Sequence, residues 1–195
     1  KTIKGIINHP LNRANKLNAI FRFINWQLSS RFKKNPIKVP FVNSTYLNVS
    51  RGMKGATGNI YSGLHEYEEM GFLLHSLRSN ETFIDIGSNI GSYSILASGV
   101  IGARSISIEP VPNTYKDMLS NIKINNLESK VYSYNIGLNN KKGHLMFSSD
   151  KDAENHVISD TTGSENNNAL KVKVDLLDTI AKDFSPNLIK IDVEG

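Results

Sequence analysis

The sequence contains no cysteine and no long apolar run. The lack of thiols excludes disulfide bonds, zinc–thiolate sites and cysteine nucleophiles, and it is typical of the cytoplasmic location that we expect. No segment approaches the roughly 20 consecutive apolar residues of a membrane-spanning helix. Since 195 residues with 39% hydrophobic content can bury one core, we expect one soluble domain with some decoration.

Acidic residues are missing from the first part of the chain. Residues 1–40 hold nine lysines and arginines and no aspartate or glutamate, whereas the other 155 residues hold 14 basic and 18 acidic side chains, a net charge of −4. Because the positive charge is confined to one segment, we predict no nucleic-acid partner. Two prolines within residues 35–40 favour a boundary there. The predicted parts are a basic arm, residues 1–40, and a domain, residues 41–195.

The arm has the pattern of a basic amphipathic helix. Apolar side chains recur at helical spacing with basic residues between them; they are Leu17, Ile20, Phe21, Ile24 and Leu28. Such a helix can pack its apolar stripe on its own domain or on a partner, or it can lie on an anionic membrane surface. The sequence leaves these alternatives open, so peripheral membrane contact stays among the expected interactions.

Beyond the arm, short apolar segments alternate with helical patterns. A glycine-rich run at residues 52–63 precedes an expected helix at residues 66–77. The later alternation, with connections of a few residues, predicts an α/β fold with a mostly parallel sheet and helices on both faces. Expected strands are residues 83–86, 105–108, 131–136, 143–148, 170–174 and 188–193; expected helices are residues 92–98, 115–125 and 175–182, and residues 149–168 are expected to form a loop.

A glycine turn after residues 83–86 carries most of the functional information. In a parallel sheet this turn lies at the carboxyl edge of its strand, with the amides of the helix start facing a ligand. A dinucleotide site requires G-x-G-x-x-G, but here only Gly87 and Gly91 are present. Asp85 adds a carboxylate that opposes a pyrophosphate and favours a ligand with ammonium and sulfonium groups. S-adenosylmethionine is such a ligand.

Further candidate side chains follow at the ends of later strands. Glu109 ends the next strand, where a carboxylate can accept both hydroxyls of a ribose. Asp192 and Glu194 point to one side of the last strand, so each is a candidate base or orienting group for a hydroxyl nucleophile. His156 is an alternative base. An equally open interpretation is that Asp192 only positions the donor, and no metal is expected, because too few oxygen ligands can be identified.

Two side chains before the glycine turn are also candidates for the donor site. Tyr61 could cover the donor with its ring, and Glu66 could reach the donor's ammonium group. The alternative for Glu66 is a charge at the start of its helix.

The motifs of residues 60–195, taken in order, resemble the FkbM family of methyltransferases. These motifs are residues 83–93, Ile108-Glu109-Pro110, residues 121–126, Leu177-Asp178 and residues 189–195. The resemblance implies a Rossmann-like class I methyltransferase fold, S-adenosyl-L-methionine as the donor, and O-methylation of sugars or other natural products. It implies a donor site of Asp85, Gly87, Ser88 (where we expect alanine in the family), Asn89, Gly91 and Tyr93, with Glu109 at the ribose and Asn135 or Ile136 near the adenine.

We therefore predict methyl transfer from S-adenosyl-L-methionine to a hydroxyl oxygen of a small molecule or glycan. One alternative is an NAD-dependent enzyme on a related sheet. The other is a non-catalytic donor-binding module that its basic arm attaches to a membrane or partner. Because residues 188–193 are apolar on both faces, which is unsuited to an edge strand, we also expect the domain of residues 41–195 to be C-terminally incomplete, with further strands after residue 195.

Overall fold

The structure is a computed structural model that describes residues 2–33, 35–148 and 169–193. Its centre is a sheet of four parallel strands in the order β5-β4-β3-β9. These strands are β3 (Thr82–Ile86), β4 (Arg104–Ile108), β5 (Val131–Tyr134) and β9 (Leu188–Ile191). The predicted parallel sheet is therefore confirmed, and the register sets Asp85 on β3 beside Ser107 on β4 and Lys190 on β9.

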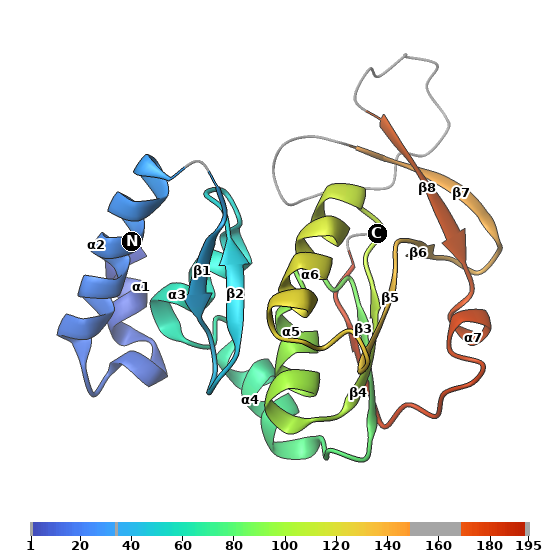
Figure 1. Ribbon diagram of the computed structural model, residues 1–195, viewed down its shortest axis with the longest axis horizontal. Coiled ribbons are helices and arrows are strands. Elements are labelled where there is room, and N and C mark those ends of the chain that lie inside the picture. The colour runs from blue at the N-terminus through green and yellow to red at the C-terminus, as the bar shows by residue number, and fades with distance from the viewer. Residues whose placement is uncertain (1, 34, 149–168, 194–195) are drawn as a thin grey trace.

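Helices cover both faces of this sheet (Figure 1). One side carries α4 (Tyr67–Ser76), α5 (Ser92–Ile95), which continues as the π-helical segment η2 (Leu96–Ile101), and α6 (Pro112–Ile124); the other side carries α7 (Leu177–Ile180). Phe83 packs with Leu73 and Leu96, whereas Ile84 packs near Leu177. All five residues of β3 are buried, as expected for a central parallel strand covered on both faces.

One predicted helix boundary needs correction. The helix expected at residues 115–125 begins earlier, because Pro112 suits the first helical position, where no amide hydrogen bond is required. The glycine-rich run, for which the sequence predicted no particular element, contains α3 (Lys54–Ser62). Gly58 is needed inside α3 for packing, since a Cβ at this position would overlap the ring of His65.

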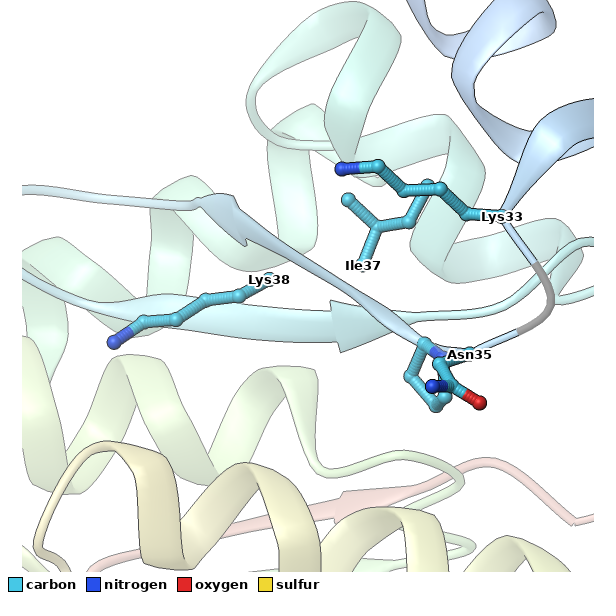
Figure 2. A pocket seen from close by; sticks show the side chains of 5 residues that line it. Lys33, Asn35, Ile37 and Lys38 are labelled. Carbon is cyan, nitrogen blue, oxygen red and sulfur yellow. The ribbon is translucent and has the colours of Figure 1, made fainter.

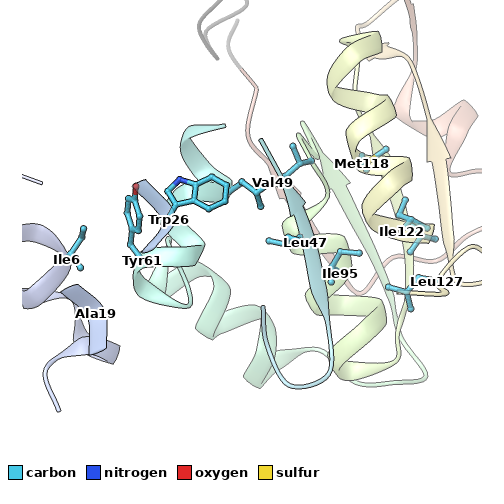
Figure 3. Close-up of a cluster of buried hydrophobic side chains, with 13 residues drawn as sticks. Ile6, Ala19, Trp26, Leu47, Val49, Tyr61, Ile95, Met118, Ile122 and Leu127 are labelled. Carbon is cyan, nitrogen blue, oxygen red and sulfur yellow. The ribbon is translucent and has the colours of Figure 1, made fainter. Parts of the chain in front are cut away.

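The N-terminal part consists of α1 (Thr2–Asn8), the short 3₁₀ helix η1 (Pro10–Asn12), α2 (Lys16–Phe32) and a hairpin of β1 (Ile37–Pro40) and β2 (Tyr46–Val49). Figure 3 shows how its buried side chains continue into the domain. Trp26 and Tyr61 belong to the same apolar cluster as Leu47, Ile95 and Met118. The arm and the domain thus share a core, and the boundary near residue 40 remains a sequence prediction.

The helix predicted in the arm is confirmed as α2, but its apolar stripe does not pack on the domain. Leu17, Phe21, Ile24 and Leu28 are exposed, while Ala19, Trp26 and Ser30 on the opposite face are buried. The outer face of α2 is therefore the apolar one.

A second, smaller sheet and an exposed edge complete the fold. The small sheet has the order β6-β8-β7, from β6 (Gly137–Leu138), β7 (Gly143–Ser148) and β8 (Ala169–Asp175). The predicted loop at residues 149–168 lies outside the described residues.

Strand β9 lies at the edge of the main sheet, where Ile191 is 68% exposed. Within the described ranges, no helix combines the length and apolar character needed to cross a bilayer.

Candidate functional site

The turn between β3 and α5 depends on two glycines. Gly87 has a φ of +74° and Gly91 a φ of +85°, in the left-handed region that favours glycine. A Cβ on Gly87 would overlap the carbonyl oxygen of Asp192, and one on Gly91 would lie 2.9 Å from Cγ of Met118. Asn89, with φ +51°, completes the left-handed turn. The close contact between Gly87 and Asp192 brings the end of β9 directly onto this turn.

The amides of the turn are already hydrogen-bonded within the protein. Gly87 and Ser88 both donate to the carbonyl of Ile108 at 3.0 Å, and Gly91 donates to the carbonyl of Ser88 at 2.8 Å. Asn89 donates to Oε2 of Glu109 at 2.9 Å. The amides of Gly87, Ser88 and Asn89 therefore hold the turn against the end of β4, and the Gly91 amide closes the turn itself. That the amides of the helix start face a ligand remains a prediction.

Ser88 fits the turn, although we expect alanine at this position from the family pattern. Its Oγ donates to the carbonyl of Asp85 at 2.7 Å and lies 3.2 Å from the carbonyl of Ile108. The hydroxyl is buried but satisfied, so it adds local hydrogen bonds without enlarging the turn.

Glu109 lies at the end of β4 and is fixed in position. Its two carboxylate oxygens accept the amides of Asn89 and Val111, each at 2.9 Å. Asn135, just after β5, donates through Nδ2 to the carbonyls of Glu109 at 2.8 Å and Pro110 at 3.0 Å. Burial raises the pKa of Glu109, and the two amides oppose that rise. Each carboxylate oxygen retains a lone pair, so the group can still accept a ligand hydroxyl. Ile136, the next residue, is half-buried.

Asp85 lies beneath the turn. Its side chain is fully buried, and Oδ2 accepts the hydroxyl of Ser94 at 2.7 Å. Oδ1 has no hydrogen-bond partner among the described residues, and the Nζ of Lys190 lies 3.7 Å from it. Burial raises the pKa of Asp85, and the charge of Lys190 opposes that rise. A direct contact between Asp85 and a ligand remains a prediction.

Lys190 is the site residue that the sequence analysis missed. Its Nζ lies 3.1 Å from Oδ2 of Asp192, 3.7 Å from Asp85 and 4.8 Å from the centre of the Tyr93 ring. A signal for it was present, because the two-residue period that links Asp192 with Glu194 places Lys190 on the same side of β9. The neighbouring strand, and therefore its partner Asp85, could not be read from the sequence.

A groove of about 680 Å³ lies beside these charges, between α4 and β9. Glu66, Glu68 and Glu69 line it together with Tyr93 and Asp192. Tyr93 donates its hydroxyl to Oε2 of Glu66 at 2.6 Å, and burial followed by this hydrogen bond raises the pKa of Tyr93. The structure thus brings together three of the predicted site residues, Glu66, Tyr93 and Asp192, in a groove with an acidic margin.

Some of the remaining candidates lie elsewhere. Tyr61 packs against Phe23 of α2, and its hydroxyl accepts Nε2 of Gln27 at 2.8 Å, so its ring is used to hold the arm. His156 and Glu194, both predicted as catalytic candidates, lie outside the described residues. Over residues 2–33, 35–148 and 169–193, no three His, Asp or Glu side chains are grouped to bind a metal.

Solved structures share parts of this fold. The Pyrococcus horikoshii protein PH0793 is 19% identical, with 54% of this chain and 37% of that chain covered, at a TM-score of 0.40. An RNA methyltransferase from Salinibacter ruber, in complex with S-adenosyl-L-homocysteine, is 26% identical, with 36% of this chain and 45% of that chain covered, at a TM-score of 0.33. The C-terminal domain of precorrin-6Y C5,15-methyltransferase from Rhodobacter capsulatus is 23% identical, with 38% of this chain and 40% of that chain covered, at a TM-score of 0.34. The chain spans less than half the length of each.

A family model gives the assignment. No curated protein matches the chain. The methyltransferase FkbM domain matches residues 85–195, which is more than half of its length. That range begins at Asp85 and includes the glycine turn, Glu109 and Asp192. The chain therefore belongs to the methyltransferase FkbM domain family, and its parallel sheet with helices on both faces is the Rossmann-like class I fold predicted from the sequence.

Proposed function

We propose that the protein transfers a methyl group from S-adenosyl-L-methionine to a hydroxyl oxygen of a small molecule or glycan. The observation that carries this proposal is the hydrogen bonding of the glycine turn. Its amides at Gly87, Ser88, Asn89 and Gly91 are already paired with the carbonyls of Ile108 and Ser88 and the carboxylate of Glu109. A pyrophosphate needs unpaired amides at such a turn, so the geometry disfavours NAD. Membership of the FkbM family supports the same choice.

The side chains around the turn suit the chemical parts of this donor. Glu109 is held so that its carboxylate can accept the two ribose hydroxyls, and Asn135 and Ile136 follow on the next strand, near the proposed adenine position. Glu66, Glu68 and Glu69 give the groove a negative margin that would attract ammonium and sulfonium groups. The donor's positive charges, rather than a phosphate, match this lining.

When bound, S-adenosyl-L-methionine supplies an electrophilic methyl group on a sulfonium. In the reaction, a bond forms between the acceptor oxygen and the methyl carbon, while the carbon–sulfur bond breaks and leaves its electron pair on sulfur. The hydroxyl proton must leave as the oxygen becomes bonded. We propose that the carboxylate of Asp192 accepts this proton. The Asp192 side chain is 65% exposed, and its Oδ2 lies 3.1 Å from Nζ of Lys190.

The acceptor class rests on charge and on family resemblance. Residues 41–195 carry a net charge of −4, which is unfavourable for a phosphate backbone. A neutral hydroxyl on a small molecule or sugar does not meet this repulsion.

Calorimetry with S-adenosylhomocysteine, S-adenosylmethionine and NAD tests the donor. We expect S-adenosylhomocysteine and S-adenosylmethionine to bind and NAD not to bind. Glu109→Gln should weaken the binding of S-adenosylhomocysteine about tenfold or more, because charge-assisted hydrogen bonds to the ribose are lost. The matched control is Glu128→Gln, an exposed glutamate beyond α6, which should bind as the parent does. Tight NAD binding without S-adenosylhomocysteine binding would reject the proposal. Binding that is never followed by methyl transfer to any hydroxyl acceptor would favour a non-catalytic module.

A further inference from the structure

The outer face of α2 is a continuous apolar stripe. Its members follow each other at intervals of four, three, four and four residues, which places them along one line of the helix. They are Leu17, Phe21, Ile24, Leu28 and Phe32, with exposed fractions from 49% for Ile24 to 84% for Phe32. Large apolar side chains gathered on one exposed face mark an interaction surface more often than isolated ones do.

The stripe faces outward because the other side of α2 is held firmly. Trp26 is 5% exposed and Ala19 fully buried in the cluster shared with the domain. Nη2 of Arg22 donates to Oδ1 of Asn12 at 2.6 Å and to the carbonyl of Tyr61 at 2.9 Å. These contacts fix the rotation of the helix, so the apolar residues cannot turn inward without breaking them.

Positive charge accompanies the stripe. Arg13, just before α2, and Lys16, its first residue, are exposed, and Arg31 and Lys33 are exposed at the other end. Figure 2 shows Lys33 extending from the end of the helix and Lys38 extending from β1. Both lysines line a depression of about 420 Å³. The first 40 residues contain no acidic side chain, whereas the remaining residues carry a net charge of −4.

We propose that the outer face of α2 binds the surface of an anionic phospholipid bilayer, with the stripe entering the interface and the basic residues contacting lipid headgroups. An exposed apolar face bordered by lysine and arginine is the arrangement that such surfaces bind. A second copy of the chain fits less well, because pairing two stripes would bring two purely basic segments together. The inference does not depend on the proposed methyl transfer.

Co-sedimentation of the chain with vesicles tests the proposal. We expect binding to phosphatidylcholine vesicles that contain phosphatidylserine, weaker binding at raised salt, and little binding to phosphatidylcholine alone. Phe21→Ser with Ile24→Ser should lower the partition coefficient at least tenfold. The matched control is Leu119→Ser, which changes an apolar residue of α6 that is 40% exposed and should leave binding unchanged.

A second pair of variants separates charge from apolar contact. Lys16→Gln with Arg31→Gln should weaken binding to the anionic vesicles on the order of tenfold. Lys116→Gln with Lys123→Gln removes the same charge from the exposed surface of α6 and should change binding less than twofold, within about the precision of such assays. The fluorescence of Trp26, the one tryptophan of the sequence, should stay unchanged in all four variants because it reports the buried face.

Three results would overturn the proposal. The first is the absence of sedimentation with phosphatidylserine vesicles, and the second is an equal loss of binding in the control variants. The third is a dimer in analytical ultracentrifugation that the Phe21→Ser, Ile24→Ser variant converts to a monomer, because the stripe would then be covered by a second copy.

Discussion

The Nζ of Lys190 lies 3.7 Å from Oδ1 of Asp85, a fully buried carboxylate oxygen that has no hydrogen bond within the described residues. The two residues occupy paired positions on adjacent parallel strands, β9 and β3. A buried carboxylate is costly unless a charge or donor compensates it, so Lys190 offsets part of the cost of placing Asp85 under the glycine turn.

Replacement of Lys190 by methionine should destabilise the protein by about 3 kcal/mol at neutral pH, because it leaves the Asp85 charge unpaired. The pKa of Asp85, already raised by burial, should rise further. Since protonated Asp85 carries no charge that needs compensation, the loss should shrink toward acidic pH. Urea unfolding of the parent and the variant, at neutral pH and at acidic pH, measures the loss of stability.

The control is Lys182→Met, which removes an exposed lysine 4.0 Å from Asp183 and should change stability by less than about 0.5 kcal/mol. Adding Asp85→Asn to Lys190→Met should recover most of the loss. A Lys190→Met loss that is the same at all pH values would show that Lys190 acts through packing instead.

Gly87→Ala should destabilise the protein by about 2 kcal/mol or more and abolish donor binding. The new Cβ would overlap the Asp192 carbonyl and would sit at a φ of +74°, which alanine avoids. Gly71→Ala is the control, because Gly71 lies in helix α4 with open space around a new Cβ. That variant should gain about 0.5–1 kcal/mol. Retained donor affinity in a folded Gly87→Ala protein would contradict the importance of this contact.

The raised pKa of Glu109 should make stability fall as pH rises. In the folded state this carboxyl holds its proton to a higher pH than in the unfolded chain, whose glutamate pKa is about 4.3. Between these two pKa values the folded state binds more protons, so the free energy of unfolding decreases with increasing pH there. Glu109→Gln should therefore show a shallower decline than the parent as the pH rises above about 4.3. Identical slopes in urea-unfolding series would refute this.

Asp192→Asn should lower turnover much more than donor affinity. The substitution keeps the shape of the side chain and its hydrogen bonding but removes the proton acceptor. Calorimetry with S-adenosylhomocysteine and a methyl-transfer assay give the two readings. Equal losses in both would assign Asp192 to donor binding.

The elements that sequence predicted well are those encoded locally. The apolar strand at Phe83, the glycine turn and the start of α5 follow one another within a dozen residues, and Glu109 directly follows the next strand. What the sequence did not predict depended on neighbours elsewhere in the chain. The amides of Gly87 and Ser88 bond to the carbonyl of Ile108, and Lys190 acquires its role from Asp85, on a strand about one hundred residues away in sequence.

The arm gives a second example of this limit. Hydrophobic periodicity located α2 to within a few residues but left open what its apolar stripe contacts, and it did not reveal that the opposite face is the buried one. The inward face is selected by one large side chain, Trp26, and by Arg22, whose partners are a side chain in η1 and a carbonyl in α3. A count of apolar residues per face cannot detect contacts of this kind.

Trp26→Ala should destabilise the whole protein by about 3–5 kcal/mol, because it empties a site at the centre of the cluster that joins the arm to the domain. Phe32→Ala, in the same helix but 84% exposed, should cost less than about 0.5 kcal/mol. Urea unfolding followed by circular dichroism, which does not require the lost tryptophan, measures both. If the arm folds with the domain, Trp26→Ala should shift a single cooperative transition. A small early transition with the main one unmoved would show instead that the arm unfolds independently, despite the buried contacts it makes with Leu47 and Tyr61.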